Sequence, residues 1–183
     1  MTARMSPAEP PFVPEIKAAL DRIMPPGVAP LVLFTTLARN ARVFGRFMAG
    51  GLLDKGSISL REREIMIDRT TARCGSEYEW GVHVAFFAEA ARLSAEQVRA
   101  TTGAAANQEV WSARDLLIVR MADELHETNS IGDALWSALR AEFSDEQILE
   151  LIVLAGFYHT VSYVTNALRL PLEPYGARFP SRD

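Results

Sequence analysis

Glu79 and His83 are the residues whose types and spacing are best suited to chemistry. They are four positions apart, so on a helix they would share one face and could border a common cavity. Glu64 lies on the apolar side of the preceding segment, where a carboxylate is costly unless it has a partner. A carboxylate beside the ring favours the imidazolium, whereas an apolar wall raises the pKa of the carboxylate itself. We therefore predict that these three residues form a catalytic acid–base group that moves protons near neutral pH.

Each of these residues also has a structural interpretation. Ser76 and Glu79 have the spacing of a helix capping box, which alone would account for Glu79. His83 could be a packed helix histidine that is satisfied by a neighbour, since structural pairs perturb pKa values too. Glu64 ends the charged run 61–64, and such runs usually form a solvated helix face. Spacing alone leaves both interpretations open.

Cys74 is the only cysteine, which excludes an intrachain disulfide and a cysteine-rich metal site. It lies beside Arg73 and just before an expected helix N-terminus, and both features favour the thiolate. Because a lone thiol has no resolving partner, a small core residue is the alternative interpretation. A single cysteine also fits a reducing, cytoplasmic setting.

Other polar and aromatic residues have weaker signals. His126 is expected at a helix C-terminus, where the dipole favours a cation, and we interpret it as structural. No glycine-rich phosphate loop and no specific metal-ligand spacing occurs, so we expect no cofactor and no bound metal. We expect four residues to contact a substrate: Ser76, Trp80, Tyr158 and His159. For the aromatic residues among them, ordinary packing is the alternative interpretation.

The composition indicates a single domain. The chain has 183 residues, of which 49% are hydrophobic, which is enough for one sizeable core and short for two. Charged residues make up 23% and the formal net charge is -4, so we expect neither a nucleic-acid nor a membrane partner. The proline-rich arm 1–14 has no signal-peptide core, and we expect no stretch long and apolar enough to span a membrane. A cytoplasmic protein that binds a small-molecule substrate is the resulting expectation.

Helix-start signals recur along the chain from residue 59 onward. Each consists of a serine followed three positions later by an acid or amide, which together satisfy two backbone N–H groups. These pairs are Ser59/Glu62, Ser76/Glu79, Ser94/Gln97, Ser112/Asp115 and Ser144/Gln147. With two earlier apolar segments they predict an all-α, single-domain bundle of about seven to eight helices, followed by an irregular tail over 171–183. The expected helices cover residues 14–24, 31–49, 60–73, 77–92, 95–102, 113–126, 133–142 and 145–168.

The run SEYEWGVH over 76–83 resembles the signature region of the carboxymuconolactone decarboxylase and alkylhydroperoxidase D superfamily. LRERE over 60–64 precedes it, and the segments 93–98, 114–126, 143–147 and 156–171 are typical of longer decarboxylase-like members. The resemblance covers roughly residues 34–174. It implies an all-helical subunit of the alkylhydroperoxidase D-like type that forms a homo-oligomer, a trimer or hexamer, with its site near a subunit boundary.

The peroxidase motif of this family consists of a glutamate, eleven residues, a cysteine, two residues, a second cysteine, three residues and a histidine. The glutamate falls on Glu64 and the histidine on His83, but the cysteine positions hold Ser76 and Glu79. Dithiol peroxidase chemistry requires a nucleophilic and a resolving thiol, and Cys74 lies two positions too early to replace either. The resemblance is therefore to the decarboxylase-like branch, which lacks the cysteine pair.

Three functional hypotheses follow. In the first, the resemblance implies a cofactor-independent decarboxylase or related lactone-processing enzyme that acts on a small carboxylated lactone. His83 would deliver or remove the proton, Glu79 would orient His83, and Glu64 would complete the relay. The second is an alkylhydroperoxidase-like antioxidant protein that uses Cys74 alone, and the third is a non-catalytic helical scaffold. Three arginines are candidates for binding a substrate carboxylate: Arg42, Arg46 and Arg73.

Overall fold

The computed structural model describes residues 3–103 and 108–181, and these ranges contain nine α-helices, one short 3-10 helix and no strand. The prediction of an all-α fold is confirmed, with one helix more than expected. The α-helices are α1 (Pro14–Ile23), α2 (Val32–Leu37), α3 (Ala41–Ala49), α4 (Leu60–Arg73), α5 (Glu77–Phe87), α6 (Ala95–Ala100), α7 (Ala113–Thr128), α8 (Asp133–Glu142) and α9 (Asp145–Leu168). The 3-10 helix η1 covers Gln108–Val110.

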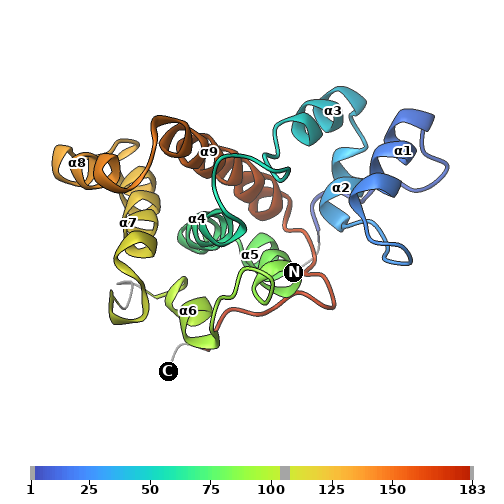
Figure 1. The fold of residues 1–183 in the computed structure, drawn as a ribbon. Coiled ribbons are helices and arrows are strands. Elements are labelled where there is room, and N and C mark those ends of the chain that lie inside the picture. The colour runs from blue at the N-terminus through green and yellow to red at the C-terminus, as the bar shows by residue number, and fades with distance from the viewer. Residues whose placement is uncertain (1–2, 104–107, 182–183) are drawn as a thin grey trace.

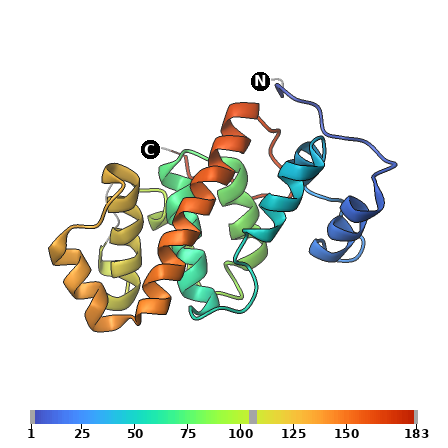
Figure 2. The ribbon, with the colours of Figure 1, turned by 90° about the horizontal axis from the view of Figure 1, so that it is seen from above.

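Helix α4 lies at the centre of the bundle and packs against α5, α7 and α9 (Figure 1). Helices α7 and α8 lie on one side of it, and α1, α2 and α3 lie on the other (Figure 2). Because neighbours cover α4 on several sides, it buries polar residues as well as apolar ones, and each buried charge needs a partner. Arg69 is a buried charge with such partners. Its guanidinium donates to both oxygens of Asp123, at 2.8 and 3.0 Å, and to the carbonyl of Thr101.

The helix-start signals explain most of the N-termini. Full capping boxes begin α4, α6 and α9, at Ser59, Ser94 and Ser144. Ser112 caps α7 by accepting from the backbone N–H of Asp115. The prediction of a capping box at Ser76 is wrong: its side chain makes no cap hydrogen bond and instead lies 2.8 Å from the Thr165 hydroxyl.

Two helices end earlier than the apolar pattern predicts. The expected helix 31–49 is two helices, because the Asn40 side chain accepts from the backbone N–H of Val43 and starts α3 as a new element. Helix α5 ends at Phe87 rather than near Arg92. Arg92 has a φ of 55° and the N–H of Leu93 returns to the carbonyl of Ala88, so a left-handed turn replaces the last helical turn. Apolar periodicity continues across both breaks and hides them from the sequence.

Helix α9 is the one helix of the described residues with the length and composition of a membrane span: it has 24 residues, and its most apolar 18-residue window has a mean hydropathy of 1.4. The expectation that no stretch reaches this length is therefore wrong, because Tyr158 and His159 interrupt the apolar run without ending the helix. Its residues are 44% buried over the most apolar window, and it runs across α4 and α5 in the bundle (Figure 2). A core helix has the same composition as a span, so this is weak evidence for a membrane.

The C-terminal tail after α9 lies along α5 of its own chain. The backbone N–H of Ala177 donates to the carbonyl of Gly81 at 2.9 Å, and the ring of Phe179 packs against Trp80. The Glu173 carboxylate accepts from the Tyr78 hydroxyl and from the backbone N–H at the start of α2. The tail thereby connects α2 to α5, on the side of the bundle that holds the site described below.

Candidate active site

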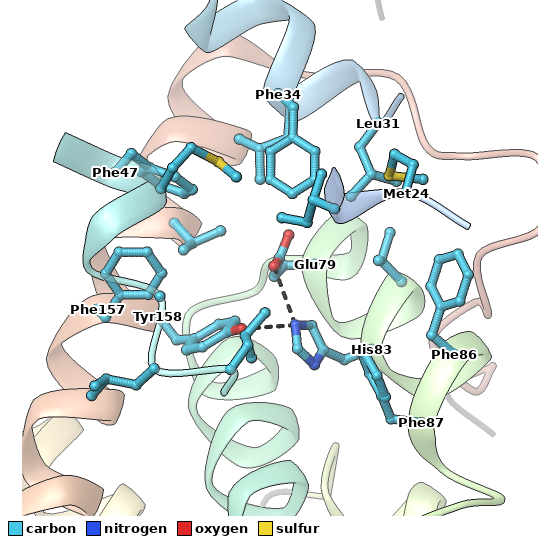
Figure 3. A pocket seen from close by; sticks show the side chains of 18 of the residues that line it. Met24, Leu31, Phe34, Phe47, Glu79, His83, Phe86, Phe87, Phe157 and Tyr158 are labelled. Atoms are coloured by element: carbon cyan, nitrogen blue, oxygen red, sulfur yellow. Dashed lines mark hydrogen bonds and ion pairs between the residues drawn. The ribbon is translucent and has the colours of Figure 1, made fainter. Parts of the chain in front are cut away.

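A pocket of about 530 Å³ lies between α5, α9 and the three N-terminal helices. Its walls are mainly apolar, and its polar lining groups include Glu79, His83 and Tyr158, which lie together on one side (Figure 3). Pockets of this size, with apolar walls and a few convergent polar groups, are typical of small-molecule sites. The aromatic residues of the walls are Phe34, Phe47, Phe86, Phe87 and Phe157.

Behind the pocket, α4 supplies the partner that orients His83. The Glu64 carboxylate is fully buried, and its Oε2 lies 2.7 Å from Nδ1 of His83. Its other oxygen accepts from the guanidinium of Arg63 at 2.7 Å. Because a carboxylate can only accept, the Nδ1 nitrogen of His83 carries a proton and Nε2 is the nitrogen that faces the pocket.

The pocket-facing nitrogen has two polar neighbours. The Tyr158 hydroxyl lies 2.9 Å from Nε2 of His83, and Oε1 of Glu79 lies 3.5 Å from it. The second carboxylate oxygen of Glu79 is buried and has no hydrogen-bond partner among the described residues. A buried carboxylate oxygen normally has a partner, so this atom is the free acceptor that the pocket offers to a ligand (Figure 3).

Burial and the two carboxylates determine the charge of this group. Burial alone would lower the pKa of His83, but Glu64 and Glu79 outweigh it and raise the pKa to about 10. Burial, with Glu79 and Glu64 nearby, raises the pKa of Tyr158 well above its usual value. At neutral pH the site therefore contains an imidazolium and a neutral phenol, both able to donate hydrogen bonds, beside the acceptor oxygen of Glu79.

Asp68 is a further buried acid that sequence reasoning missed. It lies one helical turn after Glu64 on α4, is 1% exposed, and neither carboxylate oxygen has a hydrogen-bond partner within the described ranges. Burial first, and then the Glu64 charge, raise the pKa of Asp68 well above its usual value. Asp68 is thus held as the neutral acid. The four-residue spacing from Glu64 is the signal that could have found it.

Three of the four expected substrate contacts lie outside the pocket lining as described; only Tyr158 is part of it. Ser76 faces Thr165, and the Trp80 N–H donates to the Thr101 hydroxyl, so both point away from the pocket. His159 is on the same helix as Tyr158 but adjacent in sequence, and neighbouring residues on a helix face different directions.

The proposed arginine ligands do not reach the pocket either. Arg42 and Arg46 are exposed, and Arg73 pairs with Asp123 and Glu127. Among the lining residues that the structure describes there is no arginine or lysine, whereas Asp54 and Glu79 are both acidic. The expectation that one of these arginines binds a substrate carboxylate is therefore not met within the subunit.

Cys74 also lies outside this pocket. Its Sγ is 3.8 Å from Nδ1 of His126 and 3.6 Å from Nδ1 of His159. Burial raises the pKa of the Cys74 thiol, and the Ser162 side chain and then Arg73 act in the opposite direction. The burial of the thiol thus outweighs the two features that were expected to favour the thiolate. Burial likewise lowers the pKa of His126, so it is not the cation that its helix-end position suggested.

The comparisons with known proteins identify the fold. The sequence matches no protein-family model, and no curated protein shows a significant match. Two solved structures are similar over almost the whole chain. An uncharacterized peroxidase-related protein from Silicibacter sp. TM1040 has a TM-score of 0.77 at 19% identity, covering 97% of this chain and 96% of that chain. A protein from Ralstonia eutropha JMP134, described as an alkylhydroperoxidase AhpD core and uncharacterized peroxidase-related protein, has a TM-score of 0.72 at 18% identity, covering 94% and 93%.

The fold is therefore that of the alkylhydroperoxidase D-like proteins, as the sequence resemblance implied. Sequence identities this low establish the fold and not the activity. When the peroxidase motif is aligned with this sequence, its glutamate and histidine correspond to Glu64 and His83, and these two side chains are in direct contact here. The two positions that correspond to the motif's cysteines differ in their surroundings: Ser76 is buried against α9, and Glu79 faces the pocket.

Proposed function

We propose that this protein is an enzyme that transfers a proton to or from carbon beside the carbonyl of a small, largely apolar compound such as a lactone. The observation that carries the proposal is the free oxygen of Glu79, which lies in an apolar pocket beside the His83 and Tyr158 donors. Such an arrangement combines a base with donors to the oxygen that becomes negative when the proton leaves.

Each residue has a defined part in this reaction. The substrate carbonyl oxygen accepts hydrogen bonds from Nε2 of His83 and from Tyr158. Glu79 takes the proton from the adjacent carbon, and the electron pair of the C–H bond moves onto the carbonyl oxygen to give an enolate. Glu79 then returns the proton to the same carbon or to a conjugated one, so the step is balanced without another reactant. Glu64 is a positioning residue that holds the His83 ring and its charge.

Decarboxylation of a carboxylated lactone is the narrower reaction that the sequence resemblance implies. It would use the same residues: the C–C bond breaks, carbon dioxide leaves, and the enolate that remains would take its proton at carbon from the His83 imidazolium, which solvent then protonates again. A carboxylate substrate, however, needs a cation, and the described lining offers His83 alone beside two acids. The charge of the pocket thus favours neutral substrates.

The peroxidase alternative receives less support from the site. Cys74 lies apart from the pocket, and its raised pKa disfavours the thiolate that attacks a peroxide. The cysteine positions of the peroxidase motif hold Ser76 and Glu79, so no thiol is adjacent to the Glu64–His83 pair. A proton-transfer site explains the buried acids, whereas a non-catalytic scaffold would not require an unpaired carboxylate in its pocket.

The test is hydrogen exchange into neutral lactones and unsaturated ketones in deuterated buffer, followed by NMR. The wild-type protein should catalyse deuterium incorporation beside the carbonyl, and Glu79→Gln should reduce the rate at least about 100-fold. Glu89→Gln is the matched control, because Glu89 is exposed just beyond α5. Equal exchange by wild type and Glu79→Gln would contradict the proposal. Carbon dioxide release from carboxylated lactones, measured in parallel, separates decarboxylation from simple proton transfer.

A further inference from the structure

Three groups that ligate metals lie together at the C-terminal end of α4, outside the lining of the pocket described above. Cys74 ends α4, His126 lies in the last turn of α7, and His159 lies in α9. The thiol and one ring nitrogen of each histidine all lie within 4.8 Å of one another. The chain has three histidines and one cysteine in all, so this cluster contains every such residue except His83.

We infer that Cys74, His126 and His159 bind one borderline-soft transition-metal ion, of which Zn²⁺ is the chemical type. Thiolate and imidazole are the ligands that zinc prefers in proteins. With Zn–S near 2.3 Å and Zn–N near 2.0–2.1 Å, a tetrahedral ion separates sulfur from nitrogen ligands by about 3.6 Å. The distances from Cys74 Sγ to the two Nδ1 atoms are 3.8 and 3.6 Å. Both sulfur–nitrogen distances thus match those around a tetrahedral ion, and the two ring nitrogens lie within 4.8 Å of each other.

Hydrogen bonds of its backbone hold the Cys74 ligand in place. The Cys74 backbone N–H donates to the carbonyl of Thr70, and its own carbonyl accepts from the Asn166 side chain at 2.9 Å. Arg73, which precedes Cys74 in the sequence, forms ion pairs with Asp123 and Glu127 that offset its charge. A site on three packed helices is preorganised, because little conformational freedom is lost when the ion binds.

Two of the three ligands already have the protonation state that a metal requires. Burial lowers the pKa of both His126 and His159, so at neutral pH their nitrogens have free lone pairs. Binding also requires that the Cys74 thiol, whose pKa burial raises, lose its proton to solvent. All three side chains are half-buried, so water reaches the cluster and provides the fourth ligand.

Sequence reasoning did not find this site, because the ligands have no local spacing. Cys74 is 52 positions from His126 and 85 from His159. A metal motif is recognisable in a sequence only when at least two ligands lie on one turn or one helix. Here each ligand comes from a different helix.

The test uses the full chain expressed without a polyhistidine tag and stripped with a chelator. Titration with Zn²⁺ should give one ion per chain and the release of about one proton, from the thiol. Co²⁺ should produce the visible absorption of a tetrahedral ion together with a thiolate charge-transfer band. Because Cys74 is the only cysteine, a thiol reagent reports on this site alone, and Zn²⁺ should protect it.

The variants Cys74→Ser, His126→Gln and His159→Gln should each weaken Zn²⁺ binding at least about 100-fold, since even the loss of groups that only support a ligand costs 10–100-fold. Glu79→Gln is the control and should bind Zn²⁺ as the wild type does, which excludes the pocket as the binding site. If a variant fails to fold, alkylation of Cys74 in the native protein replaces it and should abolish binding. The inference is overturned if the wild type binds no Zn²⁺ below about 10 μM, or if Cys74→Ser binds it equally well.

Discussion

The carboxylate of Glu64 and the Nδ1 atom of His83 lie 2.7 Å apart, although 19 positions separate the two residues and each belongs to a different helix. This contact determines which nitrogen of His83 faces the pocket and which charge the ring carries. Both the acid–base chemistry and much of the pH response of the protein depend on it.

The first prediction concerns the titration of the three histidines. The pKa of His83 is raised to about 10, whereas burial lowers the pKa of His126 and His159. NMR titration of the ring protons should therefore show two histidines that titrate below the usual value of about 6.5 and one that stays charged until the solution is strongly basic. Glu64→Gln should lower the raised pKa of His83, because it removes the buried carboxylate beside the ring. Three ordinary titrations between about pH 6 and 7 would contradict the charge assignment.

The second prediction concerns stability at high pH. A group whose pKa is raised by folding stabilises the folded state below its unfolded pKa, and this stabilisation is lost as the pH rises through the folded value. For His83 the window runs from about 6.5 to about 10, with a slope of up to about 1.4 kcal/mol per pH unit. Urea unfolding of wild type and His83→Asn should therefore differ most near pH 6 and converge near pH 10. A difference independent of pH would indicate a packing effect alone.

The third prediction is that Asp68→Asn stabilises the protein at neutral pH. Folding raises the pKa of Asp68, so the unfolded chain binds fewer protons and stability falls with rising pH, by about 1.4 kcal/mol per unit, above the unfolded value. The amide has nearly the same shape and never ionises. Thermal unfolding should show the gain of Asp68→Asn at pH 7 and little or none near pH 4. Loss of stability at both pH values would contradict the neutral state of Asp68.

The fourth prediction concerns the Tyr158 hydroxyl. Tyr158→Phe removes the 2.9 Å partner of Nε2 of His83 and leaves only Glu79 Oε1, at 3.5 Å, and the loss of a buried hydrogen bond costs about 0.5–1.5 kcal/mol. Chemical denaturation should detect this loss of stability, and the rate of catalysed deuterium incorporation into the substrate should also fall. Tyr163→Phe, on the same helix but 67% exposed, is the matched control and should change stability by less than about 0.5 kcal/mol.

The fifth prediction concerns the tail. A methyl group at Gly81 would overlap the carbonyl oxygen of Ala177, so Gly81→Ala should displace the tail and cost about 1–3 kcal/mol. Hydrogen exchange of residues 171–181 should then become faster. In α9, a methyl at Gly156 meets no described neighbour within 4 Å, so Gly156→Ala should stabilise the helix by about 0.5–1 kcal/mol. If the two variants changed stability and tail hydrogen exchange equally, the position of the tail would not depend on Gly81.

The sequence predicted the helical elements well wherever local signals define them. The spans of α4, α8 and α9 agree with the predicted ranges 60–73, 133–142 and 145–168, because a capping serine or an apolar period acts within a few residues. The break at Asn40 was missed, since the apolar period continues across it. At Ser76 a tertiary contact with Thr165 replaced the local cap.

Residue types and spacing on neighbouring helices were sufficient to predict that Glu64, Glu79 and His83 lie together, because an unpaired acid on an apolar helix face requires a partner nearby. Only the tertiary structure decided that Tyr158 from α9 completes this group and that Ser76, Trp80 and His159 do not. It also brought Cys74 to two histidines from other helices. The physical reason is the distance along the sequence over which each effect acts. Propensity, capping and periodicity act over one or two helical turns, whereas the packing of one helix against another determines which distant side chains meet.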